Sequence, residues 1–86
     1  MKYTVMAFYK NLGIKIRTTE YDSKAEAYEY ISGLRLTDTP YCMFDDKKVI
    51  DIMETEEVNK IEMARMIMDQ VLEKGLKNEL GRQSNQ

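Results

Sequence analysis

The stretch that decides the fold runs from Glu54 to Lys74 and reads ETEEVNKIEMARMIMDQVLEK. Its spacing predicts an amphipathic helix of about five to six turns. At about 100° per residue, its apolar side chains fall into two groups. We expect the first group to face the core: Ile61, Ala64, Met68, Val71 and Leu72. The second group, Met63, Met66 and Ile67, lies on roughly the opposite side and predicts a contact surface.

The segments before this helix predict two hairpins separated by a shorter helix. Residues 2–10 and 14–19 alternate as strands do, and Asn11-Leu12-Gly13 supplies the turn between them. Ser23-x-x-Glu26 is a capping box that begins a helix, and Gly33 is the expected left-handed stop. Residues 41–44 and 49–53 flank the polar turn 45–48.

The predicted order is therefore ββαββα, an α+β fold. We expect a four-stranded, mainly antiparallel sheet with both helices on one face. The other sheet face would show Lys15, Arg17, Met43 and Val49. Thr55 is the expected N-cap of the long helix, and Gly75 is its expected stop, with a looser last turn as far as Gly81.

Size and composition favour one globular domain over residues 1–81, followed by a mobile tail at 82–86. The chain has 86 residues, of which 43% are hydrophobic and 33% charged. No apolar run reaches the roughly 18–20 residues that span a bilayer, and the N-terminus lacks a signal-peptide pattern. The lone Cys42 allows no internal disulfide, so we expect a cytoplasmic protein.

Missing residue types exclude several kinds of catalytic site. The chain has no histidine, which rules out Ser–His and Cys–His nucleophiles and any zinc site that uses histidine. One cysteine cannot build a thiolate metal cluster within a single chain. The four glycines are scattered and form no phosphate-binding loop. We therefore expect no catalytic residues, no metal and no cofactor, and hence no enzyme.

One short motif resembles a redox site. Thr39-Pro40-Tyr41-Cys42 resembles the Cys-Pro-Tyr-Cys site of glutaredoxins with Thr39 in place of the nucleophilic cysteine. Residues 37–74 also resemble the second half of thioredoxin-like folds, in which the same proline would be the cis-proline. The helix that follows the first strand in that family is missing here. A degenerate thioredoxin- or glutaredoxin-like protein is the second alternative function.

The charges are unevenly distributed along the chain. Residues 1–19 contain four basic side chains and no acid, whereas residues 20–57 contain eleven acids and four bases. An acidic patch of Asp45, Asp46, Asp51, Glu54, Glu56 and Glu57 could meet a basic protein. Lys10, Lys15 and Arg17, together with the tyrosines, could instead form a nucleic-acid-binding face. The net charge of −2 makes nucleic acid the less favoured partner.

The leading functional hypothesis is a small, non-enzymatic interaction module of the regulatory or inhibitor type. It would bind a protein, most simply a second copy as a homodimer. The predicted partner-binding residues are Met63, Met66, Ile67 and Gln70. No membrane is expected to be involved.

Overall fold

The computed structural model describes the backbone of residues 2–84 and the side chains of residues 2–73. The chain divides into two compact units, Met1–Glu56 and Glu57–Gln86, and each is described by itself. The described elements are β1 (Tyr3–Lys10), β2 (Ile14–Tyr21), α1 (Lys24–Leu36), β3 (Tyr41–Phe44), β4 (Val49–Met53) and α2 (Lys60–Ser84). The predicted α+β class and the order ββαββα are confirmed.

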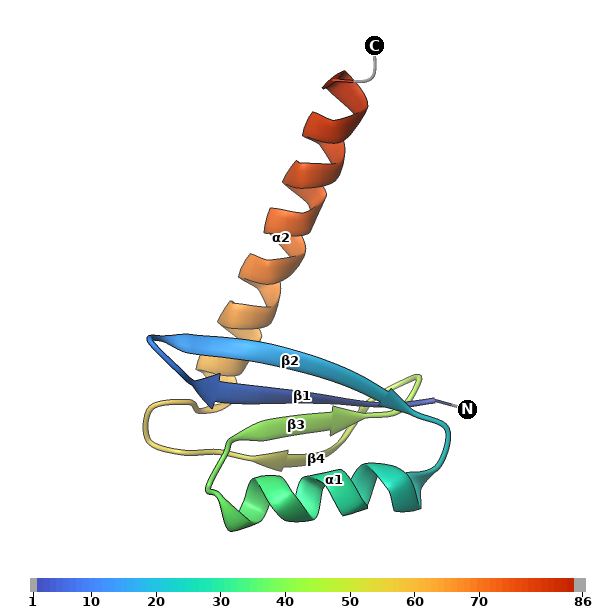
Figure 1. Ribbon diagram of the computed structural model, residues 1–86, viewed down its shortest axis with the longest axis vertical. Coiled ribbons are helices and arrows are strands. Elements are labelled where there is room, and N and C mark those ends of the chain that lie inside the picture. The colour runs from blue at the N-terminus through green and yellow to red at the C-terminus, as the bar shows by residue number, and fades with distance from the viewer. Residues whose placement is uncertain (1, 85–86) are drawn as a thin grey trace. The chain divides into compact units, whose positions relative to one another are not determined.

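The four strands of the first unit form one antiparallel sheet in the order β2-β1-β3-β4. Figure 1 shows β1, in dark blue, lying between β2 and β3. In this register Ala7 of β1 faces Arg17 of β2 on one edge and Tyr41 of β3 on the other. The N-terminal strand is therefore internal to the sheet, and its pairing with β3 joins residues far apart in the sequence.

The hairpin between β1 and β2 turns through two residues with left-handed backbone. Leu12 has φ 55° and Gly13 has φ 115°. The Asn11 amide donates to the Gly13 carbonyl at 2.7 Å, which closes the turn. Glycine suits this backbone, whereas Leu12 adopts it against the preference of a branched side chain.

Helix α1 begins as predicted and ends later than predicted. Ser23 is the N-cap, and its hydroxyl accepts from the Glu26 amide at 3.2 Å. The stop predicted at Gly33 is wrong, because the helix continues to Leu36. Thr37 caps the end, and Asp38, with φ 51°, takes the left-handed conformation that the sequence had suggested for the glycine.

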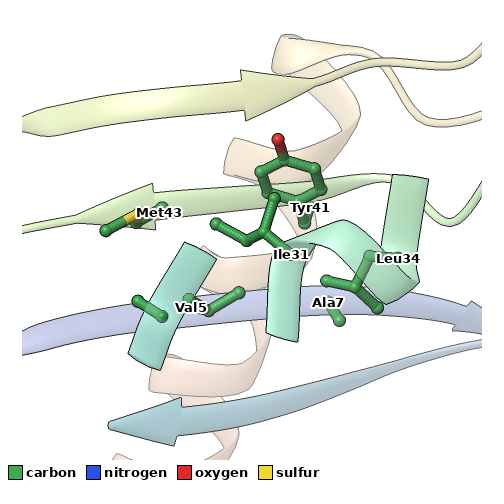
Figure 2. Packing of buried hydrophobic residues seen from close by; sticks show 7 residues of the cluster. Val5, Ala7, Ile31, Leu34, Tyr41 and Met43 are labelled. Carbon is green, nitrogen blue, oxygen red and sulfur yellow. The ribbon is translucent and has the colours of Figure 1, made fainter. Parts of the chain in front are cut away.

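The core of the first unit lies between α1 and one face of the sheet. Its buried cluster is Val5, Ala7, Ala27, Ile31, Leu34, Tyr41 and Met43. Figure 2 shows side chains of β1 and β3 meeting Ile31 and Leu34 of α1. Because Ala7 lies on this face, its neighbour Arg17 lies on the same side, as does Lys15 opposite Tyr9.

Three residues expected on the far sheet face are thus on the helix side. Met43 is fully buried in the α1 cluster, and the strand register places Lys15 and Arg17 on the same face. The opposite side of β1 and β2 carries Met6, Phe8 and Ile16 in register. The prediction for Lys15, Arg17 and Met43 is therefore wrong, because the strand register determines which alternate set faces the helix.

Helix α2 begins five residues after the predicted cap. Asn59 is the residue before it, and its side-chain oxygen accepts from the Glu62 amide at 2.9 Å. The cap predicted at Thr55 is therefore wrong. The helix passes the expected stop at Gly75 and runs to Ser84. Of the predicted tail, residues 82–84 belong to α2, and residues 85–86 lie outside the described residues.

Candidate interaction surface

The apolar side chains of α2 differ sharply in exposure between its two sides. Ile61 is 78% exposed, Met68 58%, and Val71 and Leu72 are each 59% exposed. Met63, by contrast, is 2% exposed, and Met66, Ile67 and Gln70 are half-buried. The sequence identified both sides correctly but assigned them the wrong way round. The expectation that Ile61, Met68, Val71 and Leu72 face a core, and that Met63 is exposed, is wrong.

The exposed side of α2 forms what we call the outer stripe: Ile61, Ala64, Met68, Val71 and Leu72. The first four are three, four and three residues apart, which is the spacing of the seam of a coiled coil. A stripe of this kind is apolar surface that a partner helix can cover. This spacing was legible in the sequence, but both sides of the helix were apolar and either could have faced a core.

Charged side chains border the outer stripe. The Arg65 guanidinium lies 2.7 Å from a Glu62 carboxylate oxygen and 3.3 Å from an Asp69 oxygen. These bonds raise the pKa of Arg65, chiefly through its hydrogen bond to Glu62, and the same bond lowers the pKa of Glu62. Both ion pairs are solvent-exposed, so each adds little to stability. They hold Arg65 in a defined position beside the stripe.

Two carboxylates of the predicted acidic patch, Asp45 and Asp51, accept hydrogen bonds from groups of the first unit. Asp45 closes the β3–β4 turn, where its Oδ1 accepts from the Lys47 amide at 2.8 Å and the Lys48 amide at 2.9 Å. These backbone bonds lower the pKa of Asp45. Asp46 is exposed in the same turn, and Asp51 lies within β4.

The remaining acids of that patch follow β4. Glu54 and Glu56 belong to the first unit, whereas Glu57 belongs to the second. The acidic patch as a whole stays a prediction.

Asp51 instead completes a triangle of hydrogen bonds with Arg35 and Tyr41. Arg35 Nε donates to the Tyr41 hydroxyl at 2.9 Å, and that hydroxyl donates to Asp51 Oδ2 at 3.0 Å. Arg35 Nη2 also donates to Asp51 Oδ2 at 3.2 Å. The Tyr41 ring lies in the core, so the triangle ties the end of α1 to β3 and β4. Sequence reasoning missed it because its three members lie on three different elements.

The tyrosines do not form an open stacking surface. Tyr3, Tyr9, Tyr21 and Tyr30 are partly buried against the α1 core cluster, and Tyr41 lies within it. The hydroxyls of Tyr9 and Tyr30 are 2.8 Å apart, and the rings of Tyr21 and Tyr30 are 5.9 Å apart. Burial, followed by the hydrogen bond to Tyr9, raises the pKa of Tyr30. These rings belong to the packing of α1 on the sheet.

The basic residues of the alternative nucleic-acid face are divided between the two faces of the sheet. Lys15 and Arg17 lie on the α1 side of β2, opposite Tyr9 and Ala7. Lys10 pairs with Ile14, and strand alternation places it on the other side of the sheet. The three cations therefore do not share one sheet face.

Cys42 is buried at 5% exposure, and burial raises its pKa to about 11. A redox-active thiol requires the opposite shift, towards a thiolate at neutral pH. The environment of Cys42 is that of a small core residue.

Among the residues that the structure describes, no three His, Cys, Asp or Glu side chains are grouped closely enough to hold a metal ion. Within the same part of the chain, no helix has the length and apolar character needed to cross a membrane. Neither protein-family models, nor curated proteins, nor solved structures provide a match to this chain.

Proposed function

We propose that this protein is a non-enzymatic interaction module that binds a helix of a protein partner through the outer stripe of α2. The observation that supports it is the exposure of four large apolar side chains, 58–78% each, along one side of a single helix. Contiguous apolar surface of this kind is costly in water unless another molecule covers it. A regulatory or inhibitory role in the cytoplasm is the context that we propose for this binding.

The proposal changes the predicted binding residues. Met63 is buried, so the partner-binding set moves from Met63, Met66, Ile67 and Gln70 to the outer stripe. The logic of the sequence argument is retained, because α2 still carries apolar side chains on both sides. Asp45, Asp51 and the tyrosines that pack on the α1 core cluster, by contrast, make contacts within the first unit that do not require a partner.

The test is photo-crosslinking in cells of the source organism. A benzoylphenylalanine replaces Met68 on the outer stripe or, as the control, Lys47, which is exposed in the β3–β4 turn. We expect a discrete protein adduct from position 68 that is absent from position 47. No adduct from position 68, or the same adducts from both positions, would contradict the proposal.

A further inference from the structure

A second site lies within the first unit, on the side of the sheet that faces α1. It consists of Tyr9 of β1, Lys15 and Arg17 of β2, and Tyr30 of α1, and we call it the anion site. We propose that the anion site binds a phosphate group that carries two negative charges. This site uses no residue of the outer stripe, so it goes beyond the proposed function and does not depend on it.

The strand register brings the two cations beside the tyrosine of β1. Lys15 is directly opposite Tyr9, and Arg17 is opposite Ala7, which makes Arg17 a diagonal neighbour of Tyr9. The Cβ atoms of directly opposite residues are about 4.5–5.5 Å apart, and those of diagonal neighbours about 7–8 Å, a gap that long side chains span. Lys15 and Arg17 are both exposed, so an anion can reach them from solvent.

Tyr30 reaches the same place from the helix. Its hydroxyl lies 2.8 Å from the hydroxyl of Tyr9. Burial raises the pKa of Tyr30, and the positive charge of Arg17 opposes that rise, which is the effect of a cation near the hydroxyl. Three elements therefore contribute polar side chains to one neighbourhood.

The pair of tyrosine hydroxyls leaves one hydrogen-bond donor without an acceptor. Each tyrosine has one O–H group, and the bond between Tyr9 and Tyr30 uses only one of the two protons. Among the described residues, neither hydroxyl takes part in another hydrogen bond. One phenol proton thus remains to be donated, beside an ammonium and a guanidinium group.

The elements that form the site supply no carboxylate to these donors. Glu20 is the only acid in β1 and β2, and the register puts it on the opposite face, where it pairs with Lys2 at 3.6 Å. From Tyr30 to the end of α1 there is no acid. Within the part of the chain whose side chains are described, Lys15 and Arg17 form no ion pair. The site therefore has donors and positive charge without a described counter-charge.

The number of charges and donors selects phosphate as the ligand. Lys15 and Arg17 are two residues apart on one strand, about 6.6 Å along the backbone, and they repel each other until an anion lies between them. A phosphate monoester carries about two negative charges at neutral pH and has three acceptor oxygens. It matches two cations and one O–H, with one oxygen for each donor group. A carboxylate brings one charge and two oxygens, which leaves one donor group unmatched.

The first experiment is a titration of the full chain with inorganic phosphate at neutral pH and constant ionic strength, followed by amide NMR shifts. We expect saturable shifts centred on residues 9, 15, 17 and 30. Phenyl phosphate is the second probe: tighter binding than inorganic phosphate identifies a phosphorylated molecule as the source, and equal binding identifies free phosphate. Acetate is the control anion. Shifts that do not saturate, or that acetate reproduces at the same concentration, would overturn the proposal.

The second experiment removes the cations one at a time. Arg17→Gln and Lys15→Gln should each weaken phosphate binding about tenfold, which is the effect of losing one charged hydrogen-bonding group. Lys47→Gln is the matched control, because it makes the same charge change at an exposed lysine in the β3–β4 turn. It should bind phosphate as the wild type does. Equal weakening in all three variants would show a general effect of net charge and overturn the site.

The third experiment tests the phenol proton separately from the charges. The double variant Tyr9→Phe/Tyr30→Phe loses both O–H groups and keeps both cations, so it should weaken phosphate binding by about threefold or more. Tyr9→Phe alone leaves the Tyr30 proton to be donated and should weaken binding less. The amide spectrum of each variant shows whether it is folded. Unchanged binding in the folded double variant would overturn the role of the hydroxyls, and with it the choice of phosphate over a carboxylate.

Discussion

At the scale of single residues, the β1–β2 turn places two neighbours, Leu12 and Gly13, in left-handed backbone. Gly13 has φ 115°, and an added Cβ would meet nothing within 4 Å, so a side chain there is opposed by backbone conformation alone. We expect Gly13→Ala to lower the free energy of unfolding by about 1 kcal/mol or more.

A substitution at the adjacent residue, Leu12, should have the opposite effect on stability. It has φ 55° and is fully exposed, so Leu12→Asn substitutes a residue that tolerates left-handed backbone and removes no buried contact. We expect a gain of a few tenths to about 1 kcal/mol. Urea denaturation measures the free energy of unfolding of both variants. A Gly13→Ala variant more stable than the wild type would contradict the turn geometry.

A second prediction at this scale concerns the Cys42 thiol. Because burial raises its pKa to about 11, little thiolate is present at pH 8, and the sulfur is also shielded from reagents. We expect native protein to react with a thiol reagent far more slowly than protein unfolded in urea. Labelling at the rate of a free cysteine in the native state would restore the redox alternative.

At the scale of elements, the N-cap of α2 is Asn59 in the structure, whereas the sequence predicted Thr55. Asn59 accepts from the Glu62 amide, so Asn59→Ala should destabilise the helix by about 1 kcal/mol, while Asn59→Asp should preserve the cap. Circular dichroism at 222 nm during thermal unfolding is the measurement. A melting curve of Asn59→Ala equal to that of the wild type would contradict the assigned start.

The two sides of α2 provide the next prediction. Met63→Lys places a charge where the native side chain is 2% exposed, and we expect it to cost about 3 kcal/mol or more. Met68→Lys, at 58% exposure, should change the free energy of unfolding by no more than about 0.5 kcal/mol. Chemical denaturation at low protein concentration compares them without a contribution from self-association. An equal loss of unfolding free energy in the two variants would contradict the difference in burial between the two sides of α2.

The elements also show which features of this chain were readable in its sequence. Strand alternation and the Ser23 cap depend on neighbouring residues, so the order ββαββα and the start of α1 could be predicted. The helix ends could not, because Thr55 and Asn59 are both good caps, and because Asp38 could replace Gly33 in left-handed backbone. Periodicity separated Met63 from Met68 but could not show which of them is covered, because both sides of the helix carry apolar side chains.

At the scale of the whole molecule, the buried hydroxyls make stability depend on alkaline pH. Burial is the first cause that raises the pKa of both Tyr30 and Tyr41 above the ordinary value of 10.0, and it raises that of Cys42 too. A raised folded pKa contributes stability that is complete below the unfolded pKa and is lost as pH rises towards the folded one. The protein should therefore unfold more easily above about pH 10 than at pH 8.

The effect of pH on stability is measured by the urea concentration at the midpoint of unfolding, from about pH 8 to 11. Tyr30→Phe removes one of the groups responsible, so its stability should fall less steeply between about pH 8 and 11 than that of the wild type. Tyr28→Phe is the control, because Tyr28 is 39% exposed on α1. A wild-type midpoint that stays constant up to pH 11 would contradict the buried state of these hydroxyls.

The place of β1 inside the sheet has a consequence for how the chain is made. The ribosome releases β1 and β2 first, but one edge of β1 has no strand to pair with until residues 41–44 emerge. Until then the nascent hairpin exposes unpaired main-chain N–H and C=O groups, which can form hydrogen bonds with another polypeptide. Transcripts interrupted before Tyr41 should therefore yield aggregating or degraded products, whereas those that continue past Met53 encode the complete sheet.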